Sequence, residues 1–97
     1  MYISNMRHFI DETGNIPTDM HKSARELANF HALVVDETTK LKTPIVHTGL
    51  RCFRKKCEGN ITSEILHEDE DAIHWVCTNC VNEGVIRDWQ GTRWDNR

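Results

Sequence analysis

Apolar and polar positions follow a helical period between residues 19 and 42, which predicts one long amphipathic helix. Pro17 precedes this segment, and either Thr18 or Asp19 is expected to cap its first turn. The pair Thr43-Pro44 ends it, because proline forces the preceding residue into extended backbone. The side chains expected on the buried face are Met20, Ala24, Leu27, Ala28, His31, Val34, Val35, Thr38 and Leu41.

The helical period is lost in residues 45–90, where short runs of β-branched and apolar residues are separated by polar turns. Such runs are typical of short strands, and four of them predict a three- or four-stranded antiparallel sheet. The expected strands are 45–48, 61–66, 72–76 and 84–89. The sequence therefore predicts an α+β fold, in which one amphipathic helix packs on a small antiparallel ribbon.

The two ends of the chain carry weaker patterns. Residues 1–18 are expected to form an irregular arm or a short hairpin, with a turn at Asp11–Asn15 where Gly14 supplies positive φ. Residues 91–97 are expected to form a tail whose candidate anchor is Trp94. With 97 residues in all, we expect a single compact domain.

Four cysteines form two close pairs, a C-x4-C and a C-x2-C, with nineteen residues between them. Pairs at this separation suit four thiolates that converge on one tetrahedral ion, most naturally Zn²⁺. Each pair is expected on a tight turn between antiparallel strands, with Gly59 and Gly84 relieving crowding nearby. The predicted metal ligands are Cys52, Cys57, Cys77 and Cys80.

Other uses of these cysteines stay open at this point. A rubredoxin-like iron site is less favoured because the first pair is spaced x4, and disulfides are disfavoured in a reducing compartment. A site with three cysteines and one histidine would draw on His47, His67 or His74. Four cysteines already fill a tetrahedral shell, so a histidine ligand is not required.

The motifs argue against an enzyme. A catalytic zinc site keeps an open position for water, whereas four cysteines close the shell. The chain also lacks a glycine-rich phosphate loop, a nucleophile elbow and the deaminase motif. We therefore expect a structural metal ion and no catalysis.

Charge restricts the class of partner. The net charge is −3, and four thiolates around one Zn²⁺ would bring it to about −5, which disfavours a broad nucleic-acid surface. The net charge still allows a local basic patch. The plainer interpretation of the cations near Cys57 is that they compensate the negative charge of the thiolate site. Candidate contacts to nucleic acid or another partner are Arg51, Arg54, Lys55, Lys56, Arg87 and Arg93.

The sequence also indicates a location. It contains no apolar stretch of the roughly 20 residues that a membrane helix needs, and its N-terminus lacks the order of a secretory signal. We therefore expect a cytoplasmic protein without a membrane partner.

Three tryptophans lie in the C-terminal half of the chain, at Trp75, Trp89 and Trp94. In so small a domain, large aromatic side chains are needed mainly for packing. The alternative is a stacking surface for single-stranded nucleic acid at Trp89 and Trp94, beside Arg87 and Arg93.

The stretch from Ile73 to Asp95 resembles the pattern IxWxCPxCGxEGVIxxWxGTxWD of a family of small uncharacterised bacterial zinc-ribbon proteins. Thr78 and Val81 replace the usual proline and glycine, while the cysteines of the motif are retained. The resemblance covers helix and ribbon together and implies zinc binding and a rubredoxin-like ribbon fold. It implies no activity, since none is established for that family.

Two functional hypotheses follow. The first is a non-catalytic interaction module with structural zinc, which binds another protein through the tryptophan-bearing tail or the extra apolar helix surface at Phe30 and Leu33. The second is a nucleic-acid-binding ribbon that uses the basic candidates above. An iron electron carrier is the least favoured alternative.

Overall fold

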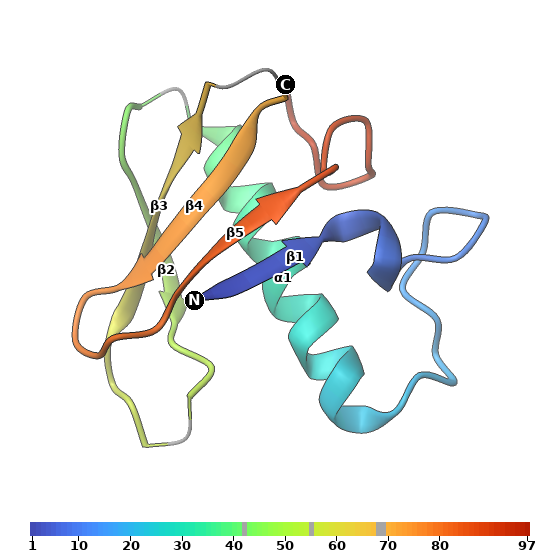
Figure 1. Ribbon diagram of the computed structural model, residues 1–97, viewed down its shortest axis with the longest axis horizontal. Helices are drawn as coiled ribbons and strands as arrows, with labels where there is room; N and C mark the ends of the chain where they lie inside the picture. The colour runs from blue at the N-terminus through green and yellow to red at the C-terminus, as the bar shows by residue number, and fades with distance from the viewer. Residues whose placement is uncertain (42, 55, 68–69) are drawn as a thin grey trace.

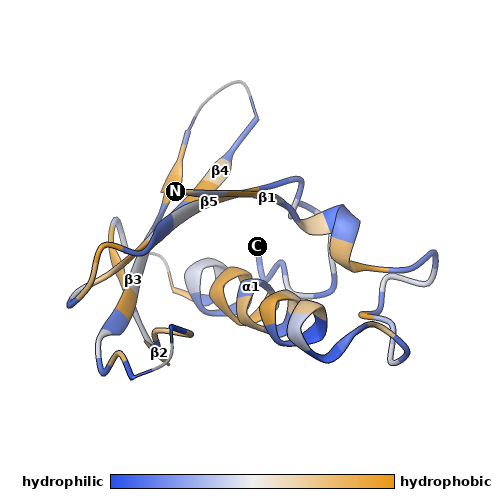
Figure 2. Ribbon diagram, turned by 60° about the horizontal axis from the view of Figure 1, so that its bottom comes forward, coloured by the Kyte–Doolittle hydropathy of each residue, from blue (hydrophilic) through white to orange (hydrophobic). Residues whose placement is uncertain are grey.

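A long helix lies against one face of a curved five-stranded sheet in the computed structural model, which describes residues 1–41, 43–54, 56–67 and 70–97 (Figures 1 and 2). The expected α+β class is therefore confirmed. The elements in chain order are β1 (Tyr2–Asn5), the 3-10 helix η1 (Met6–Phe9), α1 (Lys22–Lys40), β2 (Val46–Arg51), β3 (Asn60–Leu66), β4 (Ala72–Cys77) and β5 (Glu83–Arg87).

The strand order in the sheet is β1-β5-β4-β3-β2. Strands β2 to β5 form an antiparallel meander, so all four strands expected between residues 45 and 90 are present. The predicted strand number is wrong, because β1 adds a fifth strand that runs parallel to β5. The sheet is therefore mostly antiparallel with one parallel edge.

β1 corrects the interpretation of residues 1–18 as an irregular arm. Its register pairs Tyr2 with Gly84 and Asn5 with Arg87, so the start of the chain completes the sheet. A four-residue strand is too short for a clear alternation in the sequence, and its partner lies about eighty residues away. The expected turn at Asp11–Asn15 is confirmed, since the Asp11 N–H donates to the Asn15 carbonyl over 2.8 Å and Gly14 has φ +84°.

Helix α1 begins at Lys22, three residues later than expected, and neither Thr18 nor Asp19 caps it. The His21 side chain is the cap, and its Nδ1 accepts a hydrogen bond from the Ser23 N–H over 3.3 Å. The Thr18 carbonyl accepts instead from the Arg25 guanidinium, so Thr18 stays in the turn that precedes the helix. The helix ends at Lys40, two residues before the expected end, because Leu41 already has extended backbone; Lys42 lies outside the described residues.

The predicted apolar stripe of α1 faces the sheet and is buried at Ala28, His31, Val34, Val35 and Thr38. The two ends of the stripe depart from the prediction. Met20 precedes the helix, Ala24 and Leu27 are only half-buried, and Leu41 is 47% exposed. Of the two residues expected to widen the apolar surface, Phe30 is buried in the core, whereas Leu33 is 47% exposed. The sheet contributes Ile61, Ile73, Trp75 and Ile86 to the same core.

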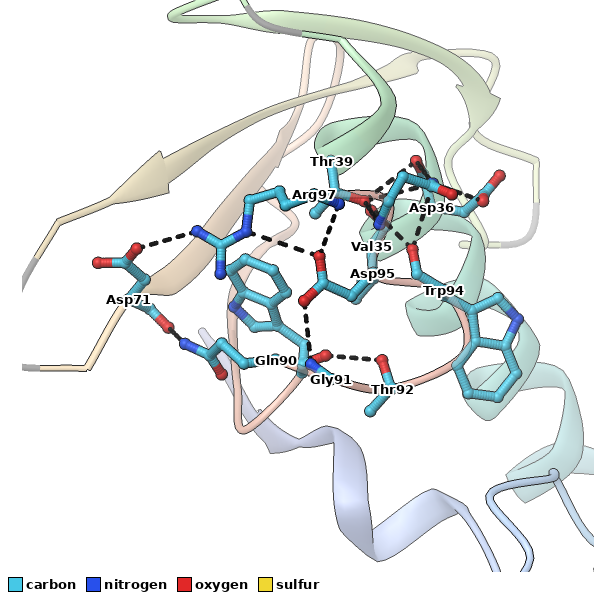
Figure 3. Close-up of polar contacts among 12 residues, drawn as sticks. Val35, Asp36, Thr39, Asp71, Gln90, Gly91, Thr92, Trp94, Asp95 and Arg97 are labelled. Atoms are coloured by element: carbon cyan, nitrogen blue, oxygen red, sulfur yellow. Dashed lines mark hydrogen bonds and ion pairs between the residues drawn. The ribbon is translucent and has the colours of Figure 1, made fainter.

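The segment after β5 packs over the end of α1 and the turn before β4 (Figure 3). Thr39 Oγ1 donates to the Trp94 carbonyl over 3.1 Å, and Gln90 Nε2 donates to the Asp71 carbonyl over 2.6 Å. Trp89 is fully buried, and the Arg97 guanidinium lies 4.4 Å from its ring centroid. Trp89, more than the partly buried Trp94, therefore fixes this end of the chain.

Candidate metal centre

Two chain turns at one end of the sheet bring the four cysteines together. Cys52 directly follows β2 and Cys57 precedes β3, while Cys77 ends β4. The sheet register pairs Cys77 with Ile61, so the β2–β3 turn and the β4–β5 turn lie side by side. The Sγ atoms of all four cysteines lie within 4.8 Å of one another, which confirms that they converge on one point.

The sulfur separations fit a tetrahedral metal ion. Tetrahedral coordination with metal–sulfur bonds of about 2.3 Å places neighbouring sulfurs about 3.8 Å apart. The Cys52 and Cys80 sulfurs are 3.7 Å apart, and the Cys57 and Cys77 sulfurs are 3.6 Å apart. A disulfide would need about 2.05 Å, and all four cysteines are free thiols in the structure. The cluster is therefore positioned to bind a metal ion.

Polar N–H groups surround the sulfurs and favour their ionised form. The Gly59 N–H donates to Cys57 Sγ and the Asn79 N–H donates to Cys77 Sγ, each over 3.4 Å. The Asn82 side-chain amide donates to the Cys52 sulfur over 3.5 Å. Such donors orient metal ligands and stabilise their charge.

Gly59 allows the two turns to approach closely. A Cβ at this position would stand 2.5 Å from the Cys77 sulfur and 2.7 Å from the Asn79 Cβ, so no other residue fits without a shift. Gly84, the second glycine expected to relieve the site, plays a different part. A Cβ there would stand 2.7 Å from the Trp75 indole, so Gly84 makes room for the core and not for the metal centre.

Thiol acidity in the metal-free cluster is uneven. Burial raises the pKa of Cys77. N–H groups of Asn79 and Cys80 and the adjoining thiols lower it by more, so that the pKa falls from 9.0 to about 7. At Cys57 the Gly59 N–H lowers the pKa, whereas burial and the other three thiols raise it, to about 12. Adjacent negative charges repel, so the sulfurs cannot all ionise alone near neutral pH. A bound cation removes that conflict by stabilising all four thiolates together.

The histidines considered as alternative ligands lie elsewhere. His74 Nε2 is 3.2 Å from Glu83 Oε2, and its Nδ1 is 3.7 Å from Glu64 Oε1. His67 is paired with Asp71, and His47 is an exposed residue of β2. Within the part of the chain that the structure describes, the one group of three or more potential ligands consists of the four cysteines.

The basic candidates separate into two places. Arg51, Arg54 and Lys56 are exposed at the first cysteine turn, and Lys55 lies outside the described residues. Arg87 stands at the far end of β5, and Arg93 donates to Asn15 Oδ1 in the C-terminal segment. The structure thus does not assemble the five described positions into one basic surface.

Two of the three tryptophans distinguish the packing role from the base-stacking role that the sequence left open. Trp75 and Trp89 are fully buried in the core, which confirms a packing role for both. A base-stacking surface that includes Trp89 is therefore wrong. The aromatic side chains that do reach the surface near the metal centre are Tyr2 and Phe53, which are 42% and 37% exposed. The sequence signal for Phe53 was its place directly after Cys52, whereas Tyr2 gave none.

No protein-family model matches this chain, and neither a curated protein nor a solved structure matches it. Among the described residues, no helix has both the length and the apolar character required to cross a membrane.

Proposed function

We propose that the four cysteines bind one Zn²⁺ as a closed structural site, and that the protein is a non-catalytic zinc ribbon that binds another protein. The observation that supports this most directly is the convergence of four free thiols at tetrahedral sulfur separations. The resemblance of Ile73–Asp95 to the bacterial zinc-ribbon family favours the same proposal.

Zinc is preferred over iron on the chemistry of the ligands. Four thiolates in a tetrahedron accept either metal. The C-x4-C spacing of the first turn departs from the paired x2 spacing expected of an iron site. Zinc has no redox chemistry, so it would serve only to hold the two turns.

A structural role follows from the size of the domain and from its closed ligand shell. A chain of 97 residues has a small core, and structural zinc adds on the order of 10 kcal/mol to the folded side. Four protein sulfurs leave no coordination position for water or substrate. The metal would therefore stabilise the end of the sheet that carries the cysteines and fix the conformation of both cysteine turns.

A protein partner is preferred over nucleic acid because the chain is acidic. Its net charge of −3 becomes about −5 with the thiolates and the zinc included. The described basic candidates lie in two separate places, and Trp89, one of the two tryptophans of the stacking alternative, is buried. Nucleic-acid binding usually needs a continuous basic surface.

Native mass spectrometry of freshly purified protein tests the metal centre. We expect one zinc ion per chain and no visible thiolate–iron absorption. Metal-free protein with native near-UV circular dichroism, or iron in place of zinc, would overturn the proposal.

Chemical crosslinking in the cells that produce the protein tests the partner. We expect crosslinks to a protein, and we expect Cys57→Ser to abolish them because it disrupts the metal centre. Retention of the purified protein on DNA or RNA at low salt, where phosphate contacts are strongest, would favour the nucleic-acid alternative.

A further inference from the structure

A surface pocket of about 300 Å³ lies beside the first cysteine turn, between that turn, β1 and the N-terminal half of α1. It is lined by Tyr2, Ser23, Glu26, Leu27 and Phe53. Figure 1 shows the β2–β3 turn and the first turns of α1 below the start of β1. A pocket of this size accommodates one large side chain.

The aromatic wall of the pocket is held by the core. The Tyr2 and Phe53 rings meet edge to face with centroids 5.5 Å apart. Phe53 also packs on the buried rings of Phe30, at 4.7 Å, and Trp75, at 5.9 Å. Contacts with buried core rings therefore hold the two half-exposed rings in place, so a ligand would lose little free energy in ordering them.

Positive charge flanks Phe53 on both sides along the chain. Arg51, Arg54 and Lys56 are exposed, and none of them makes an ion pair or a side-chain hydrogen bond with a described residue. The donors that reach the sulfurs are backbone amides and the Asn82 side chain. These three cations are consequently available to a ligand.

We propose that this pocket binds a short acidic segment of another protein. A large apolar side chain of that segment would enter between Tyr2, Leu27 and Phe53, while its carboxylates lie against Arg51, Arg54 and Lys56. The charge of the turn matches acidic groups, and the aromatic pocket supplies the burial that a surface ion pair lacks. This inference rests on the proposed function, because the metal ion would fix the turn that carries Phe53.

Glu26, which also lines the pocket, favours a peptide over a nucleic acid. A nucleic-acid strand carries a phosphate at every nucleotide and would place some of them near this carboxylate. A peptide can keep its acidic residues on the side of the cations and leave apolar or neutral atoms beside Glu26.

Selection from a phage-displayed library of random peptides on the zinc-loaded protein tests the inference. We expect enriched peptides that combine one large apolar residue with neighbouring Asp or Glu. Fluorescence anisotropy of an enriched peptide should show binding that weakens at high salt. Arg54→Glu should weaken it about tenfold, because the reversal replaces an attraction to the peptide carboxylates with a repulsion.

Matched variants separate this site from general effects. Arg93→Glu reverses an exposed charge in the C-terminal segment and should leave peptide binding unchanged. Phe53→Ser should abolish binding, and zinc content together with near-UV circular dichroism shows whether that variant still folds. Because Arg54 is exposed and without a described partner, Arg54→Glu tests the pocket even if Phe53→Ser unfolds.

Three peptide results would overturn the inference: no enrichment, enriched peptides without acidic residues, and binding that is unaffected by substitution of both Phe53 and Arg54. Tighter binding of a single-stranded oligonucleotide that requires Phe53 would also overturn it. The three peptide results leave the zinc content and the crosslinks to protein unaffected, so the proposed function is judged separately by its own experiments, whereas the oligonucleotide result would also favour the nucleic-acid alternative.

Discussion

Gly84 on β5 pairs directly with Trp75 on β4, and a methyl group at Gly84 would stand 2.7 Å from the indole ring. Trp75 is fully buried and contacts the rings of Tyr2, Phe30 and Phe53. The missing side chain of one strand thus makes the space for the largest side chain of the next. The packing of the core around Trp75 therefore depends on the absence of a side chain at Gly84.

Gly84→Ala should therefore destabilise the protein by about 1–3 kcal/mol, the usual cost of forcing extra atoms into a packed core. The measurement is urea unfolding of the zinc-loaded protein, followed by tryptophan fluorescence. Gly14→Asn is the control, since Gly14 has positive φ that asparagine tolerates and no atom lies within 4 Å of a Cβ there. Equal stability of Gly84→Ala and the unmodified protein would contradict the close packing at this pair.

Gly59→Ala should weaken metal binding more than it weakens the core. The new Cβ would stand 2.5 Å from the Cys77 sulfur and would displace a ligand from tetrahedral geometry. Loss of correct support around a ligand typically costs about 10–100-fold in metal affinity. Competition with a chromophoric chelator measures the zinc affinity. An unchanged affinity would show that the two turns have room to separate.

Cys57→Ser and Cys77→Ser should each unfold the sheet around the cysteine turns, while some of the helical circular dichroism signal survives. Removal of one thiolate opens the ligand shell and forfeits most of the roughly 10 kcal/mol that structural zinc adds. Near-UV circular dichroism reports the tertiary packing and far-UV circular dichroism reports the helix. Val81→Ser is the control, because Val81 adjoins Cys80 but is 88% exposed. A serine variant with native near-UV signal and no metal would refute a structural role for the ion.

His31 should make stability depend on pH. Burial lowers the pKa of His31 from 6.5 to about 4, an effect that a hydrogen bond with the Leu27 backbone only partly opposes. The unfolded chain binds the proton more readily than the folded protein does, so stability rises with pH across this window. The contribution of neutral His31 is fully present above pH 6.5 and is lost as pH falls towards 4, about 3 kcal/mol in all.

The measurement is the difference in unfolding free energy between the protein and its His31→Gln variant, at neutral pH and at about pH 5. Zinc content is followed in parallel, so that loss of metal in acid is not counted as an effect of His31. His8→Gln, at an exposed histidine, is the control for the substitution itself. A constant difference between the protein and His31→Gln would mean that His31 does not titrate on unfolding.

The helix and the four meander strands could be predicted because their signals are local. Val34, Val35 and Thr38 recur at helical spacing, and each strand from β2 to β5 is a run of β-branched or apolar residues. The cysteine site could also be predicted, since its two pairs lie on turns between neighbouring antiparallel strands. A local pattern suffices where elements that follow each other in the chain are also neighbours in space.

β1 and the helix start could not be predicted in the same way. The four residues of β1 acquire their role only beside β5, at the other end of the chain. The N-cap at His21 depends on a histidine ring that accepts a backbone hydrogen bond, which is outside the usual set of capping residues. Both features depend on contacts that no short window of sequence contains.

By itself, the sequence determined that this chain has one amphipathic helix, a set of short antiparallel strands and four thiols that converge at two turns. Only the three-dimensional packing shows that Tyr2 meets Phe53 and that Gly84 serves the core. The physical reason is the range of the interactions. Periodicity and ligand spacing act over a few residues, whereas side-chain packing joins residues that the chain keeps far apart.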